Sequence, residues 1–327
     1  MDNTSPIPSI IAFAIIVAIV IGGSWLNSLL KRKQQPQIPS DQTSRVSDDG
    51  SEHLRMLEDH LADAIKAGDV TREARARHRL GEAFIRHGQP NDAIPHLEKA
   101  AMLAKDQRLN DYKFIVARLA DAHMQLGRWA SAAEELRQAI EASKSLFNRS
   151  GNAGYWSLLG DVYVKQGKNI QALEAYETVL RRWRGRRYRK WRMALVQKMS
   201  TTYLELNQID VAISVLKDGA RDAKVSRDRS KEIMFLGTLG VAYERGGLQD
   251  EAMRSYEDAI HLADMAGDRR LQAVYLFNLG LLLEAKGQNE DATTYLKQAW
   301  PILINLKSPL VQECDQALSR LRKNVPL

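Results

Sequence analysis

The chain has 327 residues, of which 44% are hydrophobic and 27% charged, a balance typical of globular proteins and a length that admits one large or two modest domains. Its single cysteine, Cys314, excludes an intrachain disulfide and a cysteine-based zinc site. The formal net charge of +7 is concentrated in residues 181–192 (RRWRGRRYRKWR), which hold eight basic residues and no acidic one, so the rest of the chain carries −1.

An apolar segment near the start of the chain, residues 7–30, predicts a transmembrane anchor. No charged residue lies between Asp2 and Lys31, and the apolar run is unbroken over residues 10–21. A membrane-spanning helix needs about 20 such residues. The residues before it lack the positive charge of a cleavable signal peptide, and the segment has no polar face of the kind that a core helix shows.

The charges that flank this segment predict its orientation. Lys31, Arg32 and Lys33 follow the span directly, whereas the N-terminal tail carries only Asp2. Positive charge next to a span favours the cytoplasmic side. We therefore expect a single-pass membrane protein with an exported N-terminus and with the rest of the chain facing the cytoplasm.

A polar stretch follows and predicts a flexible linker over residues 31–51. It contains two prolines and no apolar periodicity, so it would hold the folded part about 20–25 Å from the bilayer. Residues 52–70 then predict an N-terminal capping helix, because Leu57 stands 40 residues before Leu97, which occupies a repeated position.

Small residues recur along the rest of the chain at intervals of 39 or 40. The recurring alanines are Ala93, Ala132, Ala172, Ala212, Ala252 and Ala292. In four of the six units a Leu-Gly pair precedes the alanine by about thirteen residues. A fixed interval of this size predicts stacked helical units. The expected units are about 74–111, 113–150, 153–190, 193–230, 233–270 and 273–307, followed by a C-terminal capping helix over 308–322.

The third unit is the most complete. It contains Trp156, Leu159, Gly160, Tyr163, Gly167, Ala172, Tyr176 and Val179. This pattern resembles the tetratricopeptide repeat (TPR), W-x2-L-G-x2-Y followed by A-x3-F, and the resemblance covers nearly the whole chain from about residue 52. The 40-residue period is longer than the standard 34 and is similar to that of cell-polarity adaptors and kinesin light chains.

The TPR resemblance implies an all-α, right-handed superhelix of stacked antiparallel helix pairs that binds a peptide of a protein partner in its concave groove. The groove positions of TPR families correspond here to Arg79, Glu82, Arg86, Arg118, Asp121, Asp161, Lys165, Lys198, Arg245 and Asn278. The carboxylate-gripping set of chaperone-binding repeats and the paired asparagines of polarity adaptors are matched only in fragments. Their peptide specificity is therefore not carried over.

The arginine run is a second candidate binding surface. Its residues are Arg181, Arg182, Trp183, Arg184, Arg186, Arg187, Tyr188, Arg189, Lys190, Trp191 and Arg192. Anionic lipid would attract each cation by about 1 kcal/mol, nucleic acid would bind through its phosphates, and an acidic protein segment would form Arg–carboxylate pairs. We rank acidic protein or lipid ahead of nucleic acid. Some of these arginines are also expected to pair with acids inside the stack.

No pattern in the sequence indicates catalysis, so we expect no enzymatic activity, cofactor or metal. Residues 160–168 (GDVYVKQGK) have the wrong glycine spacing for a phosphate loop, and Asn169 follows where Ser or Thr would be needed. The seven histidines are scattered. His123 replaces the motif tyrosine and is expected to be a packed, hydrogen-bonded residue.

These observations predict a membrane-anchored scaffold that recruits a protein partner through its groove, its arginine run or both. The layout resembles organelle import receptors and bacterial envelope-assembly factors, which suggests a role in assembling a membrane-associated complex. The alternative is a protein that binds anionic lipid or nucleic acid, in which the repeats only display the arginine run. The oligomeric state is not indicated.

Overall fold

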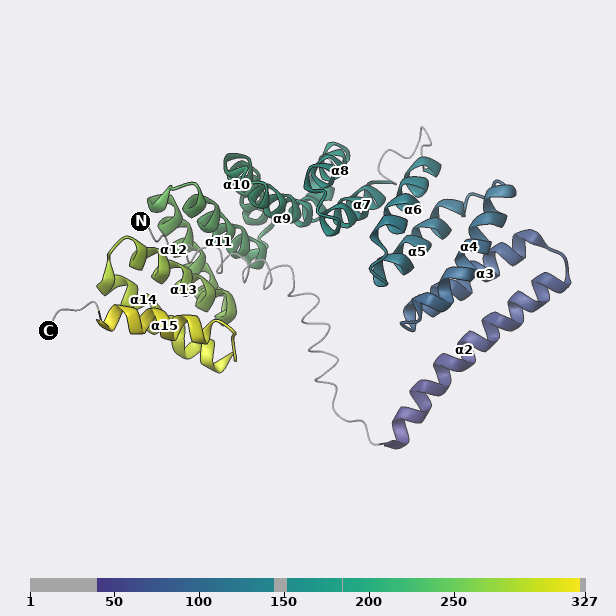
Figure 1. The fold of residues 1–327 in the computed structure, drawn as a ribbon, viewed down its shortest axis with the longest axis horizontal. Coiled ribbons are helices and arrows are strands. Elements are labelled where there is room, and N and C mark those ends of the chain that lie inside the picture. Colours follow the sequence, from purple (N-terminus) through teal and green to yellow (C-terminus); the bar gives the residue numbers. More distant parts are fainter. Residues whose placement is uncertain (1–39, 144–151, 184, 324–327) are drawn as a thin grey trace, which may run out of the picture. The chain divides into compact units, whose positions relative to one another are not determined.

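The structure, a computed structural model, describes residues 40–143, 152–183 and 185–323. These residues form helices and turns, and no β-strand occurs among them. The predicted all-α helical repeat class is therefore confirmed for this part of the chain (Figure 1). The helices fall into two compact units, an N-terminal unit within residues 34–185 and a C-terminal unit within residues 186–327.

The N-terminal unit contains three helix pairs preceded by one long helix. Its elements are α2 (Ser40–Lys66), α3 (Val70–Arg86), α4 (Pro90–Asp106), α5 (Tyr112–Gln125), α6 (Trp129–Ala142), α7 (Ala153–Lys165) and α8 (Asn169–Arg182). Each helix packs mainly on the helices before and after it in the sequence. Since turns of three residues join the members of each pair, the paired helices run antiparallel.

The C-terminal unit repeats this arrangement. Its elements are η1 (Arg186–Tyr188), α9 (Arg189–Glu205), α10 (Ile209–Ser226), α11 (Arg229–Arg245), α12 (Gln249–Ala266), α13 (Arg269–Ala285), α14 (Asn289–Asn305) and α15 (Val311–Lys323). The last described helix, α15, packs on α14. It takes the place expected for the C-terminal cap.

The turn inside each pair depends on one residue in the left-handed region. This residue is Gly88, Gly127, Gly167, Asn207, Gly247 or Gly287. In the first pair, Gln89 N donates to Phe84 O over 2.9 Å and Gly88 N to Ile85 O over 3.0 Å, which closes the end of α3. Glycine adopts this conformation without a steric penalty, and asparagine is the residue that most often replaces it.

Close contact between paired helices depends on the small residue after the motif leucine. A Cβ atom on Gly160 would lie 2.3 Å from the ring of Tyr176, and one on Gly240 would lie 2.4 Å from that of Tyr256. All six recurring alanines are fully buried between the helices. The small residues therefore set the spacing inside each pair.

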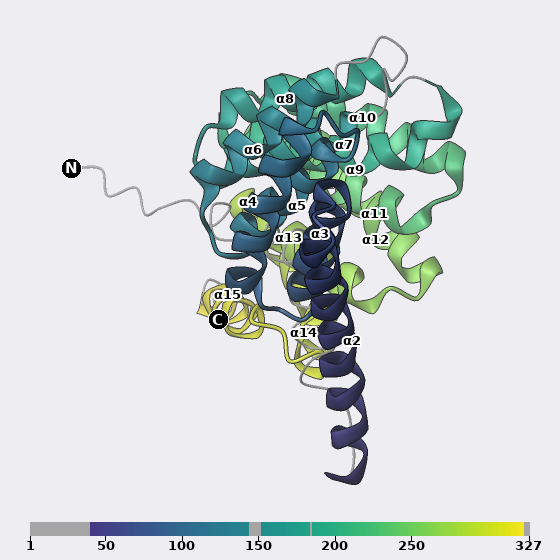
Figure 2. The ribbon, with the colours of Figure 1, turned by 90° about the vertical axis from the view of Figure 1, so that its right-hand side faces the viewer.

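The beginning of the described chain differs from the expected flexible linker. Helix α2 begins at Ser40, so it includes the last twelve residues of the linker predicted over 31–51 (Figure 2). Polar residues can extend an existing helix because propagation costs much less than nucleation. The helix ends at Lys66, before the left-handed Gly68, and Asp69 then caps α3 by accepting a bond from Arg72 N over 3.0 Å.

Several sequence predictions lie outside the described residues. These are the anchor over 7–30, the linker up to residue 39, the end of the second unit over 144–150, and Arg184. Among the helices that the structure describes, none combines the length and the apolar character needed to cross a membrane.

Candidate partner-binding groove

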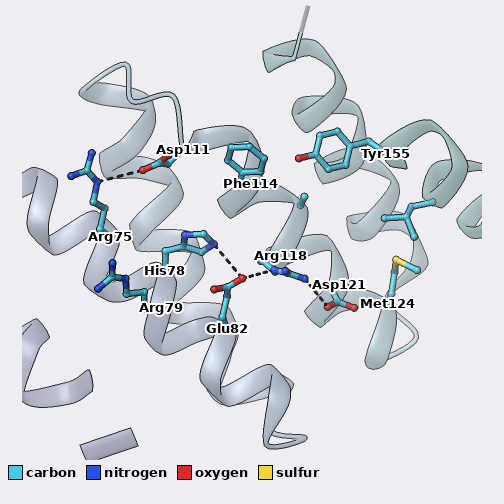
Figure 3. Close-up of a pocket in the computed structure, with 12 residues that line it drawn as sticks. Arg75, His78, Arg79, Glu82, Asp111, Phe114, Arg118, Asp121, Met124 and Tyr155 are labelled. Carbon is cyan, nitrogen blue, oxygen red and sulfur yellow. Dashed lines mark hydrogen bonds and ion pairs between the residues drawn. The ribbon is translucent and has the colours of Figure 1, made fainter. Parts of the chain in front are cut away.

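A groove of about 860 Å³ lies on the N-terminal unit, across the first helices of its three pairs (Figure 3). It is lined by Arg75, His78, Arg79, Glu82, Asp111, Phe114, Ala117, Arg118, Asp121, Met124, Tyr155 and Leu158. Four of these residues were predicted as groove positions, namely Arg79, Glu82, Arg118 and Asp121. The structure therefore brings together residues from α3 and α5 that are 39 positions apart.

The repeat itself places these side chains on one surface. Residues 75, 78, 79 and 82 recur at helical spacing on one face of α3, and residues 114, 117, 118 and 121 occupy the corresponding face of α5. Tyr155 and Leu158 continue the surface on α7. Neighbouring units thus present equivalent positions side by side.

Ion pairs that link α3 and α5 organise one end of the groove. Arg118 Nε donates to Glu82 Oε1 over 2.6 Å, and Arg118 Nη1 lies 3.9 Å from Asp121 Oδ2. Arg75 Nε donates to Asp111 Oδ2 over 3.4 Å. Arg79 is exposed and has no acidic partner among the described residues, so its charge is open to a ligand.

The other end of the groove is apolar. Phe114 is 50% exposed and Leu158 is 38% exposed, although both are large hydrophobic residues. Met124 and the half-buried Tyr155 lie beside them, and burial raises the pKa of Tyr155. Exposed apolar side chains next to organised charges are typical of binding sites for amphipathic segments.

His78 lies between these two ends and is half-buried there. Burial lowers its pKa; the Arg118 guanidinium acts in the same direction, while the Glu82 carboxylate opposes the shift. His78 Nε2 is 4.0 Å from Glu82 Oε1 and makes no hydrogen bond within the described chain. The imidazole therefore has an unused polar atom at the groove.

The other predicted groove residues of the N-terminal unit do not line the groove. Arg86 is exposed, and its Nε donates to Glu82 O over 3.4 Å. Asp161 accepts a bond from Tyr176 OH over 2.7 Å, so it also holds α7 and α8 together. Lys165 is exposed at the end of α7.

In the C-terminal unit the predicted groove residues are partly or fully buried. Arg245 Nη1 donates to Leu204 O over 3.2 Å, and burial lowers the pKa of Arg245. Lys198 is half-buried on α9. Asn278 is only 5% exposed, because α13 is buried on nearly all sides, so it does not face an open groove.

The sequence predictions missed Arg75, His78, Phe114, Tyr155 and Leu158. The signal was available in part, since Arg75, His78, Phe114 and Leu158 stand three or four positions from predicted residues on the same helix faces, whereas Tyr155 lies six positions before Asp161. Their exposure could not be read from the period, because equivalent positions are buried in other units.

The arginine run is divided between structural and exposed residues. In the N-terminal unit, Arg181 Nη2 donates to Thr178 Oγ1 over 2.9 Å and Arg182 Nη1 donates to Asn152 Oδ1. In the C-terminal unit, Arg189 Nε lies 3.3 Å from Asp222 Oδ1, and Arg192 Nη2 donates to Asp222 Oδ2. One carboxylate thus holds two of the cations of α9.

The remaining cations of the run point to solvent. Arg186, Arg187 and Lys190 are exposed and have no acidic partner among the described residues. The Arg187 guanidinium lies 4.7 Å from the centre of the Tyr188 ring, and Trp191 is 62% exposed. Trp183 is half-buried at the end of α8.

The histidines and acidic residues of the described part of the chain form no metal site. No group of three or more His, Cys, Asp or Glu residues there could hold a metal ion. His123 is buried, and its Nδ1 lies 2.7 Å from Glu135 Oε1, in keeping with a packed structural histidine. Burial raises the pKa of Glu135, and the hydrogen bond with His123 opposes that shift.

Comparisons with known proteins were made by sequence and by structure. Tetratricopeptide repeat family models match residues 117–185, 157–197 and 273–299. No curated protein sequence matches the chain.

Several solved structures are similar in fold. A putative kinesin light chain with TPR-like repeats from Podospora anserina is 21% identical, with 61% of this chain and 98% of that chain covered and a TM-score of 0.51. A signal transduction ATPase with a tetratricopeptide repeat sensor from Pyrococcus horikoshii is 19% identical, with coverages of 98% and 47% and a TM-score of 0.62. Aspartyl phosphate phosphatase F from Bacillus subtilis is 12% identical, with coverages of 98% and 81% and a TM-score of 0.58. The chain therefore carries tetratricopeptide repeats within an all-α, TPR-like helical solenoid.

Proposed function

We propose that the chain is a docking scaffold that captures a segment of a protein partner in the groove of the N-terminal unit. The observation that carries this proposal is the composition of the groove. Phe114 and Leu158 expose apolar surface at one end, while Arg79 offers an unpaired cation at the other. The TPR-type repeats support a role in protein interaction, because stacked repeats create extended binding surfaces.

The groove chemistry indicates the kind of segment that would bind. An aromatic or large aliphatic side chain of the partner would cover Phe114 and Leu158 and remove apolar area from water. The Glu82 carboxylate would accept hydrogen bonds from the segment, the Arg118 guanidinium would donate to it, and Arg79 would attract an acidic residue. Such an arrangement favours an amphipathic peptide with acidic and apolar residues on separate parts of its length.

In this proposal the apolar segment over 7–30 determines where in the cell the scaffold acts. It would anchor the chain in a membrane with its N-terminus exported, so that the right-handed superhelix expected of the repeats faces the cytoplasm. Capture of a partner would then bring that partner to the membrane and support the assembly of a membrane-associated complex. The supporting features are the apolar run and the basic residues 31–33 that follow it.

The test is selection of dodecapeptides from a random library on the full chain in mild detergent, followed by affinity measurement. Leu158→Ala and Phe114→Ala should each weaken the selected peptides about tenfold, since buried anchor residues dominate such interfaces. Ile170→Ala is the matched control, because Ile170 is an exposed aliphatic residue of α8 outside the groove. Unchanged affinity in both groove variants would refute docking at this site.

A second candidate function concerns the exposed half of the arginine run. Arg186, Arg187 and Lys190 stand beside the exposed Trp191, and this combination suits an anionic lipid surface, where each cation contributes about 1 kcal/mol. The full chain in nanodiscs should show slower amide exchange over residues 186–192 when phosphatidylserine replaces part of the phosphatidylcholine. Neutralising the three cations to glutamine should abolish the slowing, whereas Arg181→Gln should not. Equal exchange in both lipids, or protection by RNA alone, would contradict lipid binding.

A further inference from the structure

A second, smaller cavity of about 270 Å³ lies between α2 and α3 of the N-terminal unit. It is lined by Leu57, His60, Ala64, Arg72, Arg75, Ala76 and Arg79. No acidic residue lines it. We call it the α2–α3 cavity.

The space and the charges of this cavity come from helical spacing. Arg72, Arg75 and Arg79 follow one another at intervals of three and four residues, so their side chains leave the same face of α3. Ala64 and Ala76 stand between the two helices, and their methyl groups are too small to fill the gap. The result is an open volume with three arginines among its lining residues.

The acidic residues near this face are used elsewhere. Asp69 Oδ1 accepts the backbone N–H of Arg72 over 3.0 Å as the cap of α3, and Glu73 Oε1 accepts from Arg77 Nε over 2.7 Å. Asp111 lies 3.4 Å from Arg75 on the groove side. The guanidinium groups of Arg72 and Arg79 therefore have no acidic partner among the described residues.

This arrangement favours a bound anion. Like charges at helical spacing repel one another, and Arg72 lies in the first turn of α3, where the helix dipole disfavours a cation. An oxyanion in the cavity would remove both penalties, since guanidinium groups bind carboxylate and phosphate oxygens in a bidentate manner. His60 adds an imidazole at the α2 wall.

The cavity also adjoins the groove, because Arg75 and Arg79 line both. We propose that the α2–α3 cavity binds a carboxylate or phosphate group of the same partner segment whose apolar side chains occupy the groove. This inference rests on the proposed function and makes it specific. The partner segment carries an acidic or phosphorylated residue on the α2 side and an apolar residue on the α7 side.

Arg72 provides the decisive variant, because it lines the α2–α3 cavity and not the groove. Dodecapeptides selected on the full chain should contain Asp or Glu at one end and an aromatic or aliphatic residue at the other. Arg72→Gln should weaken the tightest peptide about tenfold and reduce the salt dependence of its affinity. Arg86→Gln, on the same helix but outside both cavities, is the matched control and should leave binding unchanged.

A change in the peptide should report the same contact. Replacing the acidic residue by its amide should weaken binding to the wild type about as much as Arg72→Gln does, and should have little further effect in that variant. A phosphoserine at the same position should restore tight binding to the wild type alone. Circular dichroism of Arg72→Gln should show wild-type helicity, so that the loss reports binding.

The outcomes separate this inference from the proposed function. If Arg72→Gln binds every selected peptide normally while Phe114→Ala loses affinity, the α2–α3 cavity has no role and the groove remains. If neither variant changes affinity, docking at the groove fails as well. If inorganic pyrophosphate binds the wild type and not Arg72→Gln, while the peptides show no dependence on acidic residues, the cavity holds a free small anion and the assignment to the partner is overturned.

Discussion

The two units are built from the same repeat, but a tyrosine at an equivalent position differs in its burial between them. Tyr155 and Tyr275 each stand four residues before the motif leucine of their unit. Tyr155 is half-buried and lines the groove, whereas Tyr275 is 1% exposed and belongs to the core of the C-terminal unit. The tyrosine is therefore accessible to solvent in the N-terminal unit and enclosed by packed side chains in the C-terminal unit.

The residue that faces this tyrosine from the preceding repeat also differs between the units. In the C-terminal unit it is Gly237, where a Cβ atom would lie 2.0 Å from the ring of Tyr275. At the equivalent place in the N-terminal unit stands Ala117, which lines the groove together with Tyr155. A methyl group at position 237 would not fit against the buried ring of Tyr275, whereas Ala117 and Tyr155 both line the open groove.

The largest expected effect is that of adding a methyl group at Gly237, which tests this comparison directly. Gly237→Ala should destabilise the C-terminal unit by about 2 kcal/mol, because the added methyl group overlaps a fully buried ring that has no space to move. Urea unfolding of the full chain, followed by circular dichroism, measures the loss. Gly154→Ala is the control, since no atom lies within 4 Å of its added Cβ and alanine favours a helix. An unchanged transition in Gly237→Ala would show that the ring position is not fixed.

A second expected effect concerns the aromatic residue of the motif. Tyr256→Phe should cost about 1 kcal/mol, because Tyr256 OH donates to Glu244 Oε2 over 3.1 Å and both groups are removed from water. Burial raises the pKa of Glu244 and this hydrogen bond opposes the shift, so the variant should also titrate Glu244 at higher pH. Tyr176→Phe, its counterpart in the N-terminal unit, should cost about as much, since Tyr176 OH donates to Asp161 Oδ1 over 2.7 Å and both carboxylates are half-buried. A loss confined to one of the two variants would argue against equivalent hydrogen bonds in the two units.

A third comparison uses ion pairs that join neighbouring repeats over 36 residues. Arg320 donates to both carboxylate oxygens of Glu284, over 2.8 and 2.7 Å, and so ties α15 to α13. Arg320→Gln should cost about 1 kcal/mol, whereas Arg118→Gln, which removes a more exposed pair, should cost about 0.5 kcal/mol or less. Thermal unfolding at low and high salt measures both. A larger loss for Arg118→Gln would show that the groove pairs hold the N-terminal unit together.

The smallest expected effect is a pH dependence confined to the N-terminal unit. The pKa of His78 is lowered from 6.5 in the folded state, chiefly by burial, so its contribution to stability is present above pH 6.5 and is lost as the pH falls through its folded pKa. The groups that face it include Glu82, Arg118, Asp111 and Arg79. His78→Gln should therefore flatten the stability profile on the acidic side of pH 6.5. An identical profile in wild type and variant would remove His78 as the cause.

The sequence predicted the helix pairs well because their determinants are local. The left-handed turn residues, the buried alanines and the Leu-Gly pairs each act within one unit, so their spacing reveals them. The helical start of α2 at Ser40 was not predicted, since a polar sequence shows no periodicity whether it extends a helix or not.

The candidate site was predictable only in part. Arg79, Glu82, Arg118 and Asp121 follow from the repeat, but the same reasoning also selected Asn278, which is buried. Whether a position faces solvent depends on the side chain that the next repeat places against it, and this contact is not visible in one unit. The division of the arginine run into paired and exposed residues could not be predicted for the same reason. Asp222, which binds Arg189 and Arg192, lies on the next helix, 30 residues beyond Arg192.

The contact pattern inside each unit also has a kinetic consequence. Apart from a few contacts that skip one helix, every helix packs on its immediate neighbours in the sequence. Chains with such local contacts close only short loops, and helical proteins of this kind fold in microseconds to milliseconds. During synthesis each new helix therefore emerges next to a partner that is already made, so the repeats can assemble in the order of translation.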